Sequence, residues 1–160
     1  MSDLATVILA AGKGTRMKST LPKVLHRVGG KSMLQHVLDA AKQAGASRNI
    51  VVVGFGAEQV KEAMGDQAEF VVQQEQLGTG HAVKQTAPLL AKDTGTVMVL
   101  CGDTPLLTGA LLKKLYDAHK EAGAKATVLT AIMPDAAGYG RIIRTATGTV
   151  LKIVEQKDAT

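Results

Sequence analysis

The chain has 160 residues, a net charge of +5, a single cysteine and only 2% aromatic residues. This length suits one domain with a real hydrophobic core, and the scarcity of aromatic rings argues against a protein that stacks single-stranded nucleic acid. Because no intrachain disulfide can form, we expect a cytoplasmic, reducing compartment, and we expect no secretion signal or membrane span because no suitable apolar run occurs.

Apolar runs and helical spacings alternate along the chain. Strands are predicted at residues 5–10, 49–53, 69–72, 97–101 and 126–132, with shorter ones at 141–144 and 150–154. Helices are predicted at residues 31–45, 57–64, 79–90 and 108–122. This alternation predicts an α/β fold, a Rossmann-like and mostly parallel sheet with helices on both faces. In such a sheet, ligands bind at the carboxyl ends of the strands.

The positive charge is concentrated near the start of the chain. Residues 4–38 contain no Asp or Glu but hold six cations, namely Lys13, Arg16, Lys18, Lys23, Arg27 and Lys31. Of the 19 Lys and Arg in the chain, the remaining 13 are fewer than the 14 Asp and Glu, so this segment carries the whole positive excess. Localised charge favours a site for an anionic ligand over a diffuse nucleic-acid-binding surface.

A glycine-rich, basic loop, LAAGKGTRMKSTLPKVL, occupies residues 9–25. It lacks the Gly-Lys-Ser/Thr of a P-loop, and Met17 stands where a dinucleotide-binding G-x-G-x-x-G motif needs its third glycine. Its glycines would still let backbone N–H groups approach phosphate oxygens. Arg16 offers a planar fork for such oxygens, and Lys23 a point charge. The alternative is a solvated basic turn.

A glutamine-rich loop, QQEQLGTGHA, follows the third predicted strand at residues 73–82. Glutamine amides offer both a donor and an acceptor, which suits the edge of a pyrimidine. The alternative is a polar loop in which Thr79 or Gly80 caps the next helix. In both interpretations His81 is expected to be a residue of the first helical turn and not a metal ligand.

Asp103 follows the strand predicted at residues 97–101, in the sequence CGDTPL. A carboxylate at the carboxyl end of a central strand is well placed for Mg²⁺ and a triphosphate. The alternative is that Asp103 only caps a turn with Thr104 and Pro105. Cys101 is expected to be a small core residue and not a nucleophile.

The segment GYGRI at residues 138–142, with Glu155 after it, is the last candidate. The Gly-Tyr-Gly sequence suits an ordinary hairpin loop, but it could also present backbone groups and a ring edge to a sugar. Glu155 could accept hydrogen bonds from sugar hydroxyls. Neither interpretation is excluded by the residues alone.

Taken in order, LAAGKGTRM, LPKVLH, EQLGTGHA, GDTPLL, GYGRI and IVEQKDAT resemble the uridylyltransferase domain of the bacterial N-acetylglucosamine-1-phosphate uridyltransferases. The resemblance covers nearly the whole chain. Its first loop marks the wider sugar-nucleotidyltransferase superfamily, and LPKVLH with QLGTGHA narrows it. It implies a fold of the nucleotide-diphospho-sugar transferase type. It also implies a Mg²⁺-dependent reaction of UTP with N-acetylglucosamine 1-phosphate that yields UDP-N-acetylglucosamine and pyrophosphate.

The resemblance further implies roles for matching residues. Those that would line the uridine nucleotide are Leu9, Ala10, Ala11 and Gly12. Those that would read uracil and hold the nucleoside are Gln73, Gly78 and Thr79. Arg16 would hold the β- and γ-phosphates, and Lys23 the α-phosphate and the sugar phosphate. Asp103 would bind Mg²⁺, and the residues that would contact the N-acetylglucosamine moiety are Gly140 and Glu155.

By the same resemblance, residues 1–160 are the N-terminal part of such a domain. We expect the chain to be incomplete, because the family's Asn partners for the metal and the sugar would lie beyond residue 160. The acetyltransferase β-helix, which forms trimers in the full-length family members, would also be absent. Two alternatives stay open: a non-catalytic nucleotide-binding fragment, and a related transferase for another sugar 1-phosphate or nucleotide.

Overall fold

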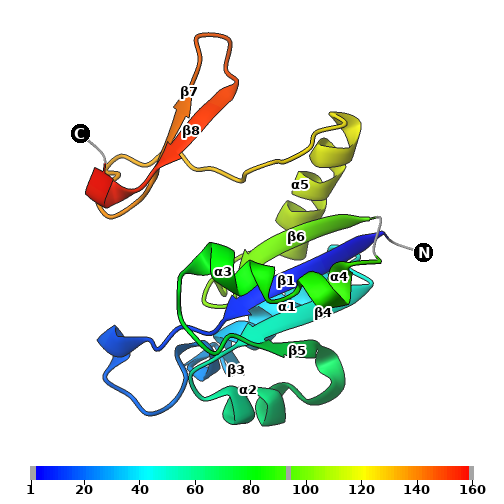
Figure 1. The fold of residues 1–160 in the computed structure, drawn as a ribbon, viewed down its shortest axis with the longest axis vertical. Coiled ribbons are helices and arrows are strands. Elements are labelled where there is room, and N and C mark those ends of the chain that lie inside the picture. The colour runs from blue at the N-terminus through cyan, green and yellow to red at the C-terminus, as the bar shows by residue number, and fades with distance from the viewer. Residues whose placement is uncertain (1–2, 93–94, 159–160) are drawn as a thin grey trace. The chain divides into compact units, whose positions relative to one another are not determined.

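The computed structural model describes residues 3–92 and 95–158 of the chain (Figure 1). The chain divides into two compact units, Met1–Gly123 and Ala124–Thr160. Among the described residues, every helix is too short or too polar to cross a membrane. The first unit holds the large sheet and most of the helices, and the second holds a β-hairpin.

The first unit is built on a four-stranded parallel sheet in the order β5-β4-β1-β6. Its strands are β1 (Leu4–Ala10), β4 (Arg48–Val53), β5 (Glu69–Val72) and β6 (Thr96–Cys101). Val7 in the middle of β1 pairs with Ile50 of β4 on one side and Val99 of β6 on the other. The predicted α/β fold with a parallel sheet is therefore confirmed, and each of these strands lies within one residue of its predicted bounds.

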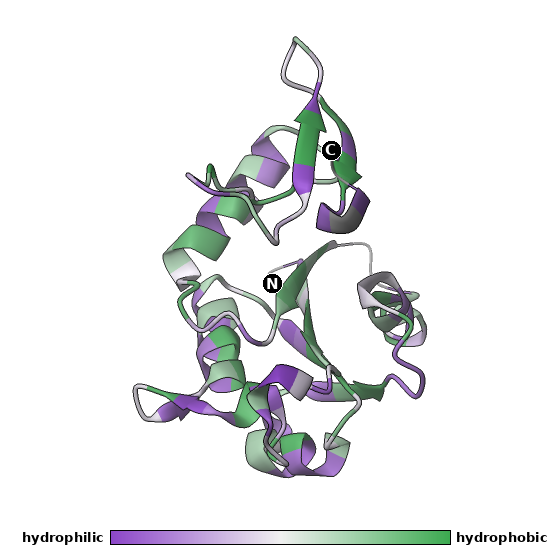
Figure 2. Ribbon diagram, turned by 90° about the vertical axis from the view of Figure 1, so that its left-hand side faces the viewer, coloured by the Kyte–Doolittle hydropathy of each residue, from purple (hydrophilic) through white to green (hydrophobic). Residues whose placement is uncertain are grey.

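Helices cover both faces of this sheet, with α3 and α4 in front of it and α1 behind it in Figure 1. The helices are α1 (Met33–Gln43), α2 (Ala57–Met64), α3 (Thr79–Lys84), α4 (Ala87–Leu90) and α5 (Gly109–Glu121). Successive strand residues point to opposite faces. Ile8 therefore enters the larger core with residues of α1, α2 and α5, while Val7 packs with Ala82 of α3. In Figure 2 the central strands are mostly green, as expected of strands buried on two sides.

Side-chain caps and a proline explain where several of the helices begin or end. The Ser32 hydroxyl accepts from the Gln35 N–H at the start of α1, and Thr108 does the same for α5. The helix predicted at residues 79–90 is wrong in one respect, because it is divided into α3 and α4. Pro88 has no N–H to continue the first helix. The predicted cap of α3 is also wrong, since the N-cap is Gly78 and no side chain caps it.

A short hairpin joins the basic loop to α1. Strands β2 (Arg27–Val28) and β3 (Lys31–Ser32) pair antiparallel around Gly29 and Gly30. Both glycines have positive φ, 56° and 89°, as a two-residue hairpin turn requires. The 3₁₀ turns are η1 (Thr15–Met17), η2 (Lys23–Leu25), η3 (Gly65–Gln67) and η4 (Gln156–Asp158).

The second unit contains the antiparallel strands β7 (Arg141–Arg144) and β8 (Val150–Val154), both at their predicted positions. The strand predicted at residues 126–132 is wrong, since this segment forms no strand. Its apolar side chains are exposed, Ile132 fully. An extended segment becomes a strand only by pairing with another, and in this unit β7 and β8 pair with each other.

Candidate functional site

The carbonyl oxygens of Leu9 and Ala11, at the start of the basic loop, accept hydrogen bonds from the segments that follow the other three strands. The Ala11 carbonyl oxygen accepts from the Phe55 N–H (3.3 Å), just after β4, and from Gln76 Nε2 (3.1 Å), in the loop after β5. The Leu9 carbonyl oxygen accepts from the Gly102 N–H (2.9 Å), just after β6. The chain leaving β1 is thus fixed where the carboxyl ends of all four strands meet.

Two glycines allow this close meeting. A Cβ on Gly54 would lie 2.8 Å from the Ala11 carbonyl oxygen, and a Cβ on Gly102 would lie 2.9 Å from that of Leu9. Either distance is too short for a real side chain. Gly54, Gly102 and Gln76 were not singled out from the sequence. For Gly54 and Gly102 the sequence does hold a signal, because each glycine comes directly after a buried strand. No local pattern in the sequence connects Gln76 with Ala11.

The four residues expected to line a nucleotide differ in exposure. Ala10 and Ala11 are buried, Leu9 is half-buried and Gly12 is exposed. A Cβ on Gly12 would meet no protein atom within 4 Å, and Gly12 does not have a positive φ. The fold itself therefore does not require glycine at this position. A glycine that leaves its backbone open in this way suits the close approach of a ligand.

The second half of the loop folds back over Lys23. Gly14 has φ +59°, and a Cβ there would lie 2.8 Å from the Lys23 Cβ. Lys18 has φ 48° and is the non-glycine residue with positive φ in the part of the chain that the structure describes. A non-glycine residue in this region costs conformational energy. Gly14 is thus needed to bring the loop against Lys23.

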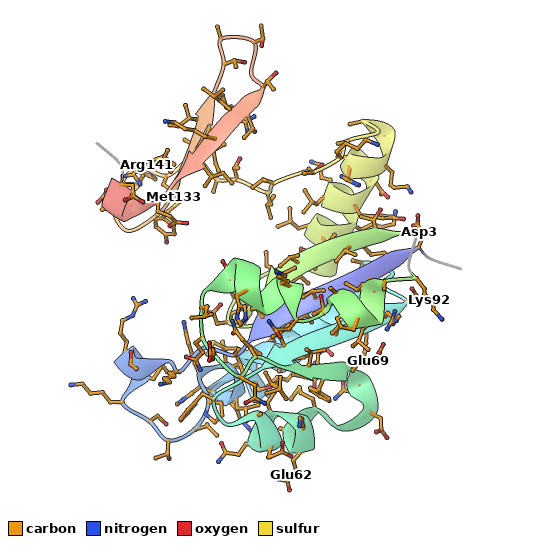
Figure 3. All side chains as sticks on the ribbon, viewed as in Figure 1. Asp3, Glu62, Glu69, Lys92, Met133 and Arg141 are labelled. Atoms are coloured by element: carbon orange, nitrogen blue, oxygen red, sulfur yellow. The ribbon has the colours of Figure 1, made fainter. Side chains whose placement is uncertain are left out.

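The cations of the loop are mostly without counter-charges. Lys13, Arg16 and Lys18 are exposed, and within residues 3–92 and 95–158 none of them forms a hydrogen bond or ion pair through its side chain. Figure 3 shows long, nitrogen-tipped side chains extending from the blue loop after β1. Uncompensated positive charge at a strand end attracts an anion.

Lys23 and Asp103 meet across 80 residues of sequence. Lys23 Nζ donates to Asp103 Oδ2 at 2.5 Å, with the side chains 39% and 35% exposed. The turn after β6 is closed instead by Thr104, whose hydroxyl donates to the Cys101 carbonyl oxygen at 2.7 Å. The alternative role of Asp103 as a turn cap therefore finds no support in its contacts, and its carboxylate faces the loop after β1.

Cys101 ends β6 with its side chain on the exposed face. The expectation that it is a core residue is wrong, because β6 is an edge strand and alternate residues of it point away from the larger core. The thiol is nevertheless partly desolvated, which raises its pKa above the ordinary value. The Asp103 carboxylate raises this pKa further, whereas Lys23 lowers it.

Cys101 can therefore report on the Lys23–Asp103 pair. Since its pKa is raised, the thiolate is scarce at neutral pH, and the rate of modification by a thiol reagent should still be rising when the pH passes the ordinary thiol pKa of 9.0. Asp103→Asn removes a negative neighbour, so it should lower this pKa and speed labelling at pH 8. Lys23→Met should do the opposite. Equal labelling rates in both variants would show that these charges do not act on the thiol.

The loop after β5 places Gln73 in a buried position, 4% exposed. The backbone N–H of Gln73 donates to the Val53 carbonyl oxygen at 2.8 Å, which holds this residue at the end of β4. The side-chain amide nitrogen of Gln73 donates to the Gly78 carbonyl oxygen at 3.2 Å. Gly78 has φ +99°, a conformation that side chains rarely adopt, and Thr79 is exposed at the first position of α3.

Gly140 and Glu155 lie together in the second unit. They flank the neighbouring ends of β7 and β8, where Arg141 pairs with Val154. A Cβ on Gly140 would lie 3.4 Å from the Val154 carbonyl oxygen and 4.0 Å from Glu155 Oε2. The expected site residues thus form two separate groups, one at the strand ends of the first unit and one at this end of the hairpin.

Asp103 is the expected ligand for Mg²⁺. Among the described residues, no group of three or more His, Cys, Asp or Glu side chains could hold a metal ion. Mg²⁺, however, commonly takes only one or two carboxylates and completes its shell with water and substrate phosphates. A partly exposed carboxylate beside the basic loop fits this kind of site.

Comparison with known proteins shows the family of this chain. Residues 6–141 match the model of the MobA-like NTP transferase domain. The bifunctional protein GlmU of Bacillus cereus (strain AH187) is 58% identical over 159 residues, which are 99% of this chain and 35% of that protein. That of Bacillus anthracis (strain CDC 684 / NRRL 3495) has the same identity and coverage. The chain spans about a third of the length of these relatives.

Solved structures are also similar. Rv0371c from Mycobacterium tuberculosis H37Rv aligns with a TM-score of 0.65 and 26% identity, over 75% of this chain and 62% of that one. Its complex with manganese aligns with a TM-score of 0.58 and 29% identity, over 74% and 60% of the two chains. The family model matches residues 6–141, and the sheet order and the basic loop agree with that match. The chain therefore belongs to the family of MobA-like NTP transferase domains.

Proposed function

We propose that this domain transfers the uridylyl group of UTP to N-acetylglucosamine 1-phosphate, forming UDP-N-acetylglucosamine and pyrophosphate. The observation that carries the proposal is the contact of Lys23 with Asp103, which joins the basic loop after β1 to the carboxylate after β6. The likeness to GlmU proteins over 99% of the chain supports the choice of substrates.

The reaction needs no covalent enzyme intermediate. A phosphate oxygen of the sugar phosphate attacks the α-phosphorus of UTP in line, a new P–O bond forms, and the bond to the β-phosphate oxygen breaks, with its electron pair leaving on pyrophosphate. The protein contributes positioning and charge neutralisation. Lys23 would hold the α-phosphate and the sugar phosphate, Arg16 the β- and γ-phosphates, and the open backbone at Gly12 the nucleotide.

The other assignments follow the same scheme. Gln73, Gly78 and Thr79 would hold uracil and its nucleoside, and Gly140 and Glu155 the sugar. Asp103 would bind Mg²⁺, which when bound neutralises phosphate charge in the transition state. A cytoplasmic location goes with this proposal, because a lone thiol such as Cys101 is typical of reducing compartments.

The test is calorimetric titration of the domain with UTP, CTP, GTP and dTTP in Mg²⁺, followed by assay of pyrophosphate release with and without N-acetylglucosamine 1-phosphate. We expect preferential binding of UTP, and pyrophosphate only when the sugar phosphate is present. UTP binding without pyrophosphate would favour a non-catalytic nucleotide-binding fragment. Preference for another nucleotide would favour a related transferase.

Two alanine substitutions in the basic loop should separate ligand contact from folding. In Gly12→Ala the new Cβ enters open space, so stability should change by less than about 0.5 kcal/mol, while UTP binding weakens because the Cβ occupies the ligand's approach. Gly14→Ala places a Cβ against Lys23 at positive φ and should lower stability by about 1–2 kcal/mol. Thermal unfolding measures the stability of each variant, and calorimetry measures its affinity for UTP. Unchanged UTP affinity in Gly12→Ala would contradict contact between the Gly12 backbone and the nucleotide.

A further inference from the structure

His81, in the first turn of α3, lies between two glutamine side chains. Its Nδ1 is 3.0 Å from Gln73 Nε2, and its Nε2 is 2.9 Å from Gln85 Nε2. Gln73 Nε2 also lies 3.2 Å from the Gly78 carbonyl oxygen, and Gln85 Nε2 lies 3.2 Å from the carbonyl oxygen of His81 itself. Each ring nitrogen therefore faces an amide group.

The two amides cannot both donate to the ring, because a neutral imidazole carries one N–H and one acceptor nitrogen. Gln73 is buried, 4% exposed, and turning its amide would replace its hydrogen bond to the Gly78 carbonyl oxygen with a repulsive contact between two oxygens. Turning Gln85 gives up its donation to the His81 carbonyl oxygen, but Gln85 is only partly buried, so water can hydrogen-bond that oxygen and the turned amide nitrogen. His81 is thus an acceptor at Nδ1 and a donor at Nε2.

These contacts of the Gln73 amide nitrogen leave the amide oxygen, Oε1, as a hydrogen-bond acceptor without a partner. Both amide hydrogens are directed at Gly78 and His81, and Oε1 has no hydrogen-bond partner among the residues that the structure describes. This oxygen is also not fully buried. Among the described residues, the fully buried side-chain nitrogen or oxygen without a hydrogen-bond partner is His26 Nε2, and Gln73 Oε1 is not in that class. Gln73 Oε1 is therefore an acceptor of fixed direction that is not fully buried.

We propose that His81 is a positioning residue for base selection. Its Nδ1 holds the Gln73 amide so that Oε1 accepts a hydrogen bond from the N3–H of uracil, an inference that rests on the proposed use of UTP. Cytosine is the same size but presents an acceptor nitrogen at N3, which would face the lone pairs of this oxygen. His81 acts through Gln73 and does not itself contact the nucleotide.

The test compares UTP and CTP binding by calorimetry in the wild-type domain, His81→Leu and His81→Asn. In His81→Leu the Gln73 amide loses one of its two partners and is held by the Gly78 carbonyl oxygen alone, so the preference for UTP over CTP should fall by about tenfold, the size of one hydrogen bond. His81→Asn should keep most of the preference, since its amide oxygen replaces Nδ1 as acceptor. Lys84→Ala, at an exposed position of α3, is the matched control and should bind like the wild type.

The outcomes separate this inference from the function on which it rests. If the wild type prefers UTP and His81→Leu weakens UTP and CTP equally, His81 is only structural and the inference is wrong. If the wild type shows no preference for UTP, the proposed function fails. Nitrogen-15 NMR of the unmodified imidazole gives a check that does not depend on how the variants fold: an unprotonated Nδ1 is expected, and a proton on Nδ1 would overturn the inference.

Discussion

Asp103→Asn should abolish metal-dependent uridylyl transfer, lowering the rate by at least about 1000-fold because several kcal/mol of charge stabilisation is lost with the metal. The variant should also lose the tightening of UTP binding by Mg²⁺. Without metal, UTP binding should instead become a few-fold stronger, since Asp103 no longer repels phosphate or engages Lys23. Calorimetry with and without Mg²⁺, and Mn²⁺ binding followed by electron paramagnetic resonance, measure these effects.

Asp117 supplies the control for this experiment. Its carboxylate accepts from Lys113 at 2.6 Å, and its side chain is 44% exposed, close to the 35% of Asp103. Asp117→Asn removes the same charge from a similar ion pair on α5, so metal and UTP binding should remain as in the wild type. If Asp103→Asn keeps the Mg²⁺ dependence of the wild type, Asp103 is not the metal ligand.

Lys23→Met should weaken UTP binding by about 10- to 100-fold, the range expected for one hydrogen bond from a charged group. The transfer rate should fall further, because the same ammonium would neutralise the phosphate that is attacked. Folding stability should change by no more than about 1 kcal/mol, because the pair with Asp103 is partly exposed. Calorimetry, rate assays and thermal unfolding distinguish these effects.

Lys61 is a matched lysine elsewhere in the same unit. It donates to Glu58 at 2.8 Å within α2, and its side chain is 34% exposed against 39% for Lys23. Lys61→Met should leave UTP binding unchanged. If it weakens binding as much as Lys23→Met, the effect comes from net charge, and a specific contact of Lys23 with phosphate is disproved.

Much of the fold could be predicted because its signals are local. The runs ending at Ala10, Val53 and Cys101 are apolar in themselves, and α2 occupies its predicted bounds, Ala57–Met64. The predictions failed where an element depends on its neighbours. Residues 126–132 have the composition of a strand but form none, and Cys101, at the end of the edge strand β6, is exposed.

The sequence by itself determined the α/β class, the segment that carries the positive charge and the candidate residues, because these depend only on the types of residues and their spacing along the chain. Only the tertiary structure decided which of these residues meet. The contact of Lys23 with Asp103 and that of Gln76 with Ala11 span 80 and 65 residues. The placement of the two ring nitrogens of His81 between the amides of Gln73 and Gln85 was decided there too, since it depends on how the loop after β5 packs against α3.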